Sequence, residues 1–194
     1  MRQSISNFIV IEGIDGTGKT TIANALVDLF NESGRHSLYT DGFFDKFKEE
    51  KKKYISGSNN DPQKSYEFFM SAMHLASKKI LTLATDKIVV CDRYIYSTIA
   101  YHRHLGAIVH DPNELNVIQP KLLVNLICSD EAIRQDRLRK KRNPSKYDML
   151  TLRSGNYMHL VQNELCGNAR HHIDTTSTDI QTIAKGIVQL YERT

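Results

Sequence analysis

A lysine and two threonines follow closely spaced glycines near the N-terminus. Residues 13–20 read Gly-Ile-Asp-Gly-Thr-Gly-Lys-Thr, which matches the pattern G-x-x-x-x-G-K-[ST] of a phosphate-binding loop. Main-chain N–H groups that converge on one point, with the positive end of a helix behind them, suit the phosphates of a nucleotide. We expect Lys19 to reach the outer phosphates and the hydroxyl of Thr20 to ligate Mg²⁺. The residues expected to bind the nucleotide are Gly13, Asp15, Gly16, Thr17, Gly18, Lys19, Thr20 and Thr21.

The flanking sequence supplies the context that this motif requires. An apolar run from Phe8 to Ile11 predicts a buried strand, and the stretch from Thr21 to Ser33 predicts a helix. Strand, phosphate loop and helix therefore follow one another in the order that the motif needs. The alternative, a glycine-rich turn with a chance lysine, is disfavoured because both flanking elements lie in register.

A second acidic element comes where another apolar strand ends. Residues 87–92, Lys-Ile-Val-Val-Cys-Asp, predict a buried parallel strand that finishes on Asp92. Ligands of open parallel sheets bind beyond the carboxyl ends of the strands, where we also expect Glu12 and Asp41. Asp92 is the best candidate for holding Mg²⁺, directly or through water, and Arg93 beside it suits a phosphate. The alternative is that Asp92 only caps the next helix.

The remaining chain alternates strands with helices. The sequence predicts further strands at 37–40, 87–92, 120–128 and 173–175, and helices at 63–84, 93–105, 131–142 and 149–168, with a last helix that Ser177 or Thr178 caps and that reaches about residue 191. Such alternation indicates a parallel sheet with helices on both faces. We therefore predict an α/β fold, a three-layer sandwich of the P-loop NTPase type around a parallel sheet of about five strands. No repeats or linkers are visible, so a single domain should span residues 1–194.

Composition is that of an ordinary globular protein. The 194 residues carry a formal net charge of +4, which favours anionic small ligands without indicating nucleic acid or a membrane as a partner. The lysine-rich run at residues 46–53 is predicted to be a solvated helix face rather than a binding patch. No secretory signal and no apolar run of roughly 20 residues is visible, so we expect a cytoplasmic protein.

Two motifs together resemble one enzyme family. Residues 92–101, Asp-Arg-Tyr-Ile-Tyr-Ser-Thr-Ile-Ala-Tyr, are similar to the D-R-Y-x-x-S-x-x-A-Y segment of thymidylate kinases, and residues 11–21 resemble the phosphate loop of that family, including its acidic residue. The order of the later elements also fits, so the resemblance covers nearly the whole chain. It implies an enzyme that transfers the γ-phosphoryl group of ATP, bound with Mg²⁺, to a nucleoside monophosphate. It also implies dTMP as the leading acceptor, dTDP as the product and a homodimer.

The resemblance implies roles for residues that would bind the acceptor. Asp15 would hydrogen-bond the sugar of the acceptor nucleotide, and Arg93 would bridge the acceptor phosphate and the transferred phosphoryl group. Ser97 and Tyr101 lie one helical turn apart and would face the base and sugar of the acceptor. Simple helix packing explains Ser97 and Tyr101 equally well.

A basic stretch lies where the family carries a mobile lid, which we place at about residues 137–149. Positive charge there would neutralise phosphates when the lid closes. Gly16 stands where some family members have an arginine, so a lid arginine, either Arg137 or Arg142, is the natural source of charge for the transition state. For any single residue of the stretch, a solvated helix face is an equal alternative. The stretch comprises Arg134, Arg137, Arg139, Lys140, Lys141 and Arg142.

The acceptor side departs from the family pattern. Phe69, or its neighbour Phe68, falls where the family stacks an aromatic ring on the acceptor base, but His74 stands where the long helix carries a phosphate-gripping arginine. His102 replaces a common glutamine, and residues 40–44 replace an Arg-Glu-Pro-Gly-like segment. These changes leave open another acceptor, such as UMP, CMP, a different deoxynucleotide or a nucleoside. A non-catalytic regulatory module that binds ATP is the remaining alternative.

Overall fold

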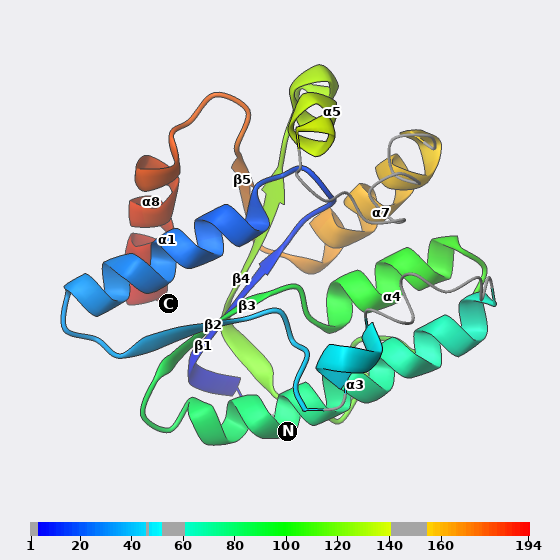
Figure 1. Ribbon diagram of the computed structural model, residues 1–194, viewed down its shortest axis with the longest axis horizontal. Helices are drawn as coiled ribbons and strands as arrows, with labels where there is room; N and C mark the ends of the chain where they lie inside the picture. Colours follow the sequence, from blue (N-terminus) through cyan, green and yellow to red (C-terminus); the bar gives the residue numbers. More distant parts are fainter. Residues whose placement is uncertain (1–3, 46, 52–60, 141–154) are drawn as a thin grey trace.

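The computed structural model describes residues 4–45, 47–51, 61–140 and 155–194 of the chain. A sheet of 5 parallel strands forms its centre, with the strand order β2-β3-β1-β4-β5 (Figure 1). The first strand is thus the central one, and the loop that follows it lies at the middle of the carboxyl edge. The strands are β1 Ser4–Glu12, β2 Ser37–Thr40, β3 Ile88–Asp92, β4 Gln119–Ile127 and β5 His171–Asp174.

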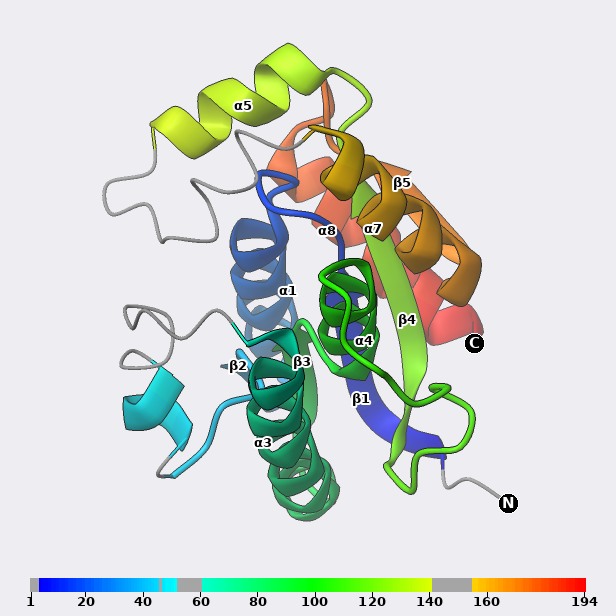
Figure 2. The ribbon, with the colours of Figure 1, turned by 90° about the vertical axis from the view of Figure 1, so that its right-hand side faces the viewer.

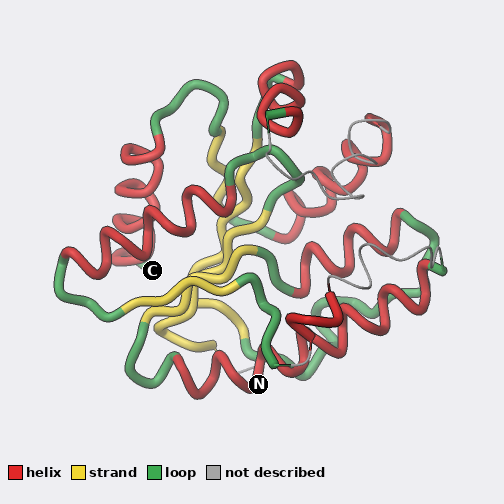
Figure 3. The backbone as a smooth tube through the Cα atoms, viewed as in Figure 1, coloured by secondary structure: helices red, strands yellow, loops and turns green. Residues whose placement is uncertain are grey.

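Helices cover both faces of this sheet (Figure 3), which confirms the predicted three-layer α/β fold. Helices α1 and α8 pack against each other on one face, and α3 and α4 cover the other, where α7 packs beside α4. None of the described helices is long and apolar enough to cross a membrane. The helices are α1 Lys19–Glu32, α3 Pro62–Leu83, α4 Ile95–His104, α5 Glu131–Arg139, α7 Gly155–Asn168 and α8 Ile180–Arg193.

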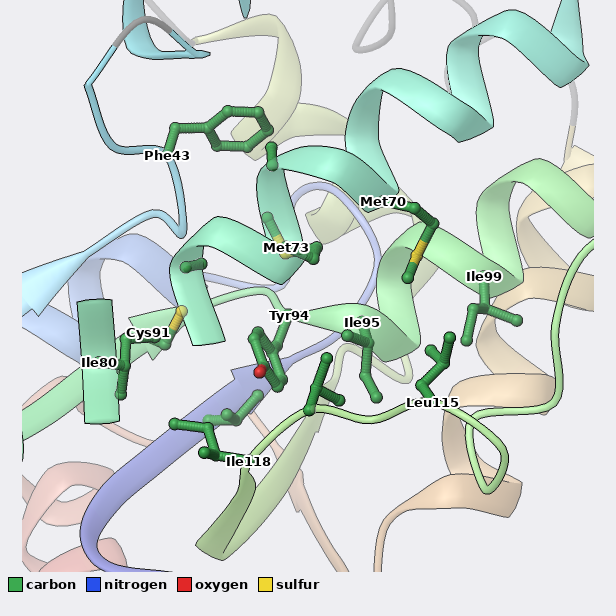
Figure 4. Close-up of a cluster of buried hydrophobic side chains, with 14 of the residues drawn as sticks. Phe43, Met70, Met73, Ile80, Cys91, Tyr94, Ile95, Ile99, Leu115 and Ile118 are labelled. Carbon is green, nitrogen blue, oxygen red and sulfur yellow. The ribbon is translucent and has the colours of Figure 1, made fainter. Parts of the chain in front are cut away.

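The central strand β1 supplies side chains to both halves of the core. Residues 8–11 are fully buried, and successive side chains of a strand point to opposite faces of a sheet. Phe8 and Val10 therefore join the cluster beneath α3 and α4, which Figure 4 shows, whereas Ile9 and Ile11 join the cluster beneath α1 and α8. An apolar run without alternation in the sequence is the consequence of this burial on both faces.

Several boundaries differ from the sequence-based expectation. Helix α4 begins at Ile95 rather than at residue 93, because Arg93 adopts a left-handed conformation with φ 75° that a helix excludes. Helix α5 ends at Arg139, and the start predicted for the following helix at residue 149 lies outside the described residues. The cap of α8 is Asp179, whose side chain accepts from the N–H of Thr182, so neither Ser177 nor Thr178 holds that position.

The start of α1 differs from the starts of α3 and α5, which side chains cap. Asp61 and Asp130 cap α3 and α5 with their carboxylates, as their positions before these helices predict. Helix α1 follows Gly18, which has no side chain to accept from the first N–H groups. These N–H groups therefore stay available to an anion at the carboxyl edge of the sheet.

The buried face of β1 gives a test of the core. Ile9→Ala should lower the free energy of unfolding by about 2–5 kcal/mol, because Ile9 is 0% exposed and its removal leaves a cavity between β1 and α1. Ile108→Ala is the matched control, since Ile108 is 85% exposed and its loss should change stability by less than about 0.5 kcal/mol. Urea denaturation of both variants measures the difference, and equal destabilisation would contradict the assigned core.

Candidate active site

The phosphate loop joins β1 to α1 at the carboxyl edge of the sheet. Gly13 and Gly16 have φ values of 142° and 87°, which L-residues with a side chain rarely adopt. A Cβ atom on Gly13 would lie 2.5 Å from the carbonyl oxygen of Leu126, and one on Gly16 would lie 2.8 Å from the carbonyl oxygen of Arg134. The loop is therefore pressed against β4 and α5 so closely that only glycine fits at these two positions.

Lys19 folds back over the loop that precedes it. Its ammonium donates to the carbonyl oxygen of Ile14 at 2.7 Å, and the residue is only 6% exposed. Burial, with a smaller contribution from the charge of Arg93, lowers the pKa of Lys19 to about 8, against the opposing charges of Asp15, Asp92 and Glu12. A buried ammonium beside free main-chain N–H groups is poised to meet an anionic ligand.

Thr20 and Asp92 lie in contact, as the sequence predicts for two metal ligands. The Thr20 hydroxyl donates to Oδ2 of Asp92 at 2.5 Å, and the hydroxyl of Tyr39 donates to the same oxygen at 3.3 Å. Among the described residues, nothing hydrogen-bonds Oδ1 of Asp92, although this oxygen is buried. A buried carboxylate oxygen without a partner, beside a hydroxyl at the phosphate loop, is the donor set that suits Mg²⁺.

The carboxylate of Glu12 caps a helix from outside that helix. Its Oε1 accepts from the N–H of Tyr94 at 2.9 Å and from the N–H of Ser97 at 3.2 Å, and its Oε2 accepts from the hydroxyl of Ser97. The N-cap residue of α4, Tyr94, makes no side-chain cap itself. Glu12 is 1% exposed, so the last residue of β1 ties the phosphate loop rigidly to the first turn of α4.

Arg93 is the centre of a polar cluster beside the phosphate loop. Its guanidinium donates to Oδ1 of Asp15 at 2.6 Å, to the Ser97 hydroxyl at 2.9 Å and to the Tyr101 hydroxyl at 3.4 Å. The guanidinium carbon also lies 5.0 Å from the centre of the Tyr101 ring. The structure thus gathers four residues that the sequence assigned to the acceptor: Asp15, Arg93, Ser97 and Tyr101.

A single cavity of about 780 Å³ joins these groups. Its wall includes the phosphate loop with Lys19, Thr20 and Asp92, and its other lining residues come from two parts of the fold, which we call its two arms. One arm is lined by Phe43, Phe69, Met73, Arg93, Tyr101 and His102. The other arm is lined by Arg137, Leu138, Thr175, Thr178, Ile180 and Ile183. The phosphate loop thus shares one cavity with both sets of residues, which is the arrangement that a reaction between two bound ligands requires.

The predicted residues of α3 divide between the cavity and the surface. Phe69 lines the cavity and meets the Phe43 ring edge-on, with centroids 5.6 Å apart, whereas Phe68 packs against Phe47. The structure does not bring His74 into the cavity, because its position on α3 faces solvent and its Nδ1 lies 2.9 Å from the carbonyl oxygen of Met70. The preceding residue, Met73, points into the cavity instead.

His102 lines the same arm but has both ring nitrogens engaged. Nδ1 lies 2.7 Å from the carbonyl oxygen of Thr98, and Nε2 lies 2.9 Å from the hydroxyl of Ser65. Because a carbonyl only accepts, Nδ1 carries the hydrogen and Nε2 accepts from Ser65. Burial lowers the pKa of His102, which favours this neutral form, and its ring packs 5.3 Å from the ring of Phe69.

The basic stretch separates into residues with different contacts. Arg134 is 1% exposed and donates to the main-chain oxygen of Asp15 at 2.7 Å while pairing with Glu131, so it fastens the phosphate loop to α5. Arg137 lines the second arm of the cavity and donates to the main-chain oxygen of Thr175 at 2.6 Å. Arg142, Lys141 and most of the predicted lid lie outside the described residues.

Three residues line the cavity although the sequence alone did not point to them as parts of the site. Lys51, within the run predicted to be a solvated helix face, lines the first arm and pairs with Asp41. Tyr39 and Met73 also line the cavity, without any motif that marks them. The phenylalanines at 43, 44 and 47 could have indicated the position of Lys51. Three apolar side chains so close together predict that this segment packs on the core, which places Lys51 near the cavity.

The buried Glu12 gives a pH-dependent prediction. Burial raises the pKa of Glu12 above its ordinary 4.5, while its hydrogen bonds from Ser97 and the charge of Arg93 oppose this only in part. Ionisation therefore costs more in the folded than in the unfolded state, and stability is lost as the pH rises through the folded pKa. Between pH 4.5 and neutral pH, the unfolding free energy should fall in the wild type relative to Glu12→Gln. Urea denaturation measures both proteins, and a difference in unfolding free energy that stays the same at every pH in that range would contradict this prediction.

Comparison with known proteins agrees with the geometry. The sequence pattern of the family named Thymidylate kinase matches residues 11–186. A probable thymidylate kinase of Staphylothermus marinus is 32% identical over 200 residues, 94% of this chain and 96% of that protein. A probable thymidylate kinase of Pyrococcus abyssi is 33% identical over 156 residues, 74% of this chain and 75% of that protein. The solved structure of thymidylate kinase from Candida albicans has the same fold, with a TM-score of 0.70 at 19% identity, over 98% of this chain and 92% of that one. The chain belongs to the thymidylate kinase family, which consists of ATP-dependent nucleoside monophosphate kinases.

Proposed function

We propose that this enzyme transfers the γ-phosphoryl group of ATP to dTMP and releases ADP and dTDP. The observation that carries the proposal is the single cavity in which a phosphate loop and the Arg93 cluster face one another. Phosphoryl transfer requires little covalent chemistry from the protein, because positioning of the two phosphates and stabilisation of their charge supply most of the effect. The polar groups around this cavity are of the kind that such positioning needs.

On the donor side, the main-chain N–H groups at residues 13–20 and the ammonium of Lys19 would hold the outer phosphates of ATP. Thr20 and Asp92 would hold Mg²⁺, and the unpartnered Oδ1 of Asp92 supports this assignment. When bound, Mg²⁺ neutralises charge on the phosphates.

On the acceptor side, Arg93 would bridge the acceptor phosphate and the phosphoryl group in transit. A half-buried guanidinium that Asp15, Ser97 and Tyr101 already orient loses little freedom when it binds a phosphate. Asp15 and Tyr101 would also contact the sugar of the acceptor. The ring of Phe69, which lines this arm, would stack on the acceptor base.

Three further features of the enzyme are proposals that rest on the sequence and on its resemblance to the family. They are a homodimeric assembly, a cytoplasmic location and a single domain with a lid at about residues 137–149. Arg137 and Arg142 remain the proposed sources of transition-state charge from this lid. For Arg137 this role requires release from the main-chain oxygen of Thr175, to which it donates in the described conformation.

A panel of acceptors tests the proposed substrate. ADP release with ATP and Mg²⁺ should be fastest with dTMP among dTMP, UMP, CMP, dCMP and thymidine. The alternative of another acceptor is motivated by Met73 and the fully engaged His102, since neither offers a free polar group to a base. Clear preference for a different acceptor would replace dTMP in the proposal, and no acceleration by any of them would favour a non-catalytic ATP-binding module.

Loss of the Lys19 charge should abolish most of the activity. Lys19→Ala is expected to lower turnover by roughly a hundredfold or more, because a preorganised charge at the transferred group is removed from a water-poor site. The fold should persist, since among the described residues the ammonium hydrogen-bonds only the loop carbonyl of Ile14. Steady-state turnover with circular dichroism as the folding control measures both effects. Wild-type-like turnover would refute the role of Lys19.

The lowered pKa of Lys19 predicts proton uptake when ATP binds. With a pKa of about 8, Lys19 is largely neutral in the free enzyme at about pH 8.5, and the phosphates of bound ATP favour its charged form. Titration calorimetry in buffers of different ionisation enthalpy should therefore detect a proton taken up. Lys19→Arg keeps a permanent charge and should bind ATP without that uptake. Equal uptake by both proteins would assign the proton to another group.

A further inference from the structure

Lys51 brings a positive charge to the acceptor arm of the cavity from a segment that sequence analysis had placed on the surface. It lies in the helical stretch described at residues 47–51, which lies beside α3, where the ring of Phe47 packs against that of Phe68 (Figure 2). Its side chain lines the cavity and is 28% exposed. A flexible, partly exposed ammonium at the wall of a cavity is well suited to meet an anionic ligand.

Two neighbours fix the position of this ammonium. Nζ of Lys51 lies 2.9 Å from Oδ2 of Asp41 and 3.9 Å from the centre of the Phe43 ring. Oδ1 of Asp41 accepts from the N–H of Phe43 at 3.2 Å, so the carboxylate is itself held at the end of β2. Since Thr40 is paired with Cys91, Asp41 follows β2 beside Asp92, and Lys51 is anchored next to the carboxyl end of β3.

The other cations of the cavity are bound more closely by groups of the protein. Lys19 donates to the phosphate loop itself, Arg137 is bound to Thr175 in the opposite arm, and Arg93 forms a 2.6 Å ion pair with Asp15. Lys51 has a partner as well, but Asp41 is 38% exposed and an ion pair so open to water contributes little. An ammonium has three donors, and among the described residues only Asp41 accepts from this one, so it can bind a phosphate without leaving Asp41.

We infer that Lys51 binds the phosphate of the acceptor nucleotide and thereby makes the enzyme select phosphorylated acceptors over unphosphorylated nucleosides. The inference rests on the proposed function, because it assigns a role within the acceptor arm. Asp41 acts as the positioning residue that keeps the ammonium directed into the cavity. Lys51, from the helical stretch that follows β2, and Arg93, directly after β3, then approach the acceptor phosphate from different segments, while the ring of Phe43 lies under the ammonium of Lys51.

A comparison of dTMP with thymidine isolates the phosphate contribution. Binding of each ligand to the full-length protein is measured by titration calorimetry, for the wild type, Lys51→Met and Lys51→Arg. Lys51→Met should weaken dTMP binding by about tenfold or more, because a charged hydrogen bond to the phosphate is lost, and should change thymidine binding by less than about twofold. Lys51→Arg should restore most of the affinity for dTMP. Lys79→Met is the matched control, since Lys79 forms a similar exposed pair with Asp45 and does not line the cavity.

The possible results separate the inference from the proposed function. Equal weakening of dTMP and thymidine by Lys51→Met would show a merely structural role, and unchanged dTMP affinity would overturn the inference directly. If the acceptor panel identifies a different nucleotide, that nucleotide and its nucleoside replace dTMP and thymidine in the same comparison. If the wild-type enzyme uses no phosphorylated acceptor at all, the proposed function fails and the role of Lys51 fails with it.

Discussion

The geometry of this site depends on the buried carboxylate of Glu12. Removing a carboxylate from water costs several kcal/mol unless hydrogen bonds compensate, as a general order of magnitude. Glu12 accepts from two N–H groups and one hydroxyl at the start of α4, and it stands directly before the phosphate loop. Because Arg93 directly precedes Tyr94, the N-cap residue of this helix, the same contact sets the distance between the loop that would hold ATP and the guanidinium that would hold the acceptor. The left-handed backbone of Arg93 is held in place by these neighbours.

Much of the fold and of the donor side could be predicted from the sequence, because their signals are local. The phosphate loop is a short motif between a strand and a helix, and the close contacts of the loop with β4 and α5 require its glycines at positions 13 and 16. Apolar runs predicted the buried strands because these runs, too, are signals that lie within a few adjacent residues. The pairing of Thr20 with Asp92 followed from one topological rule, that the carboxyl ends of parallel strands share an edge.

The acceptor side was harder to predict because it depends on how segments distant in sequence approach one another. A shift of one residue along α3 decides whether Met73 or His74 faces the cavity, and spacing alone does not fix that rotation. Lys51 enters the cavity only because its segment folds back towards β2, which no periodicity reveals. Arg134 belongs to a basic stretch that suggests a mobile lid, yet it is buried as a fastener of the phosphate loop.

The central claim is that ATP and the acceptor meet between the phosphate loop and Arg93, beside a metal on Thr20 and Asp92. A crystal structure with Mn²⁺ and an analogue in which five phosphates join adenosine to thymidine tests it most directly. The account predicts an anomalous peak at coordination distance from the Thr20 hydroxyl, with Asp92 bound directly or through water, and the Arg93 guanidinium in contact with the phosphate chain. A metal remote from Thr20 and Asp92, or a thymidine end bound away from Arg93 and Phe69, would contradict it.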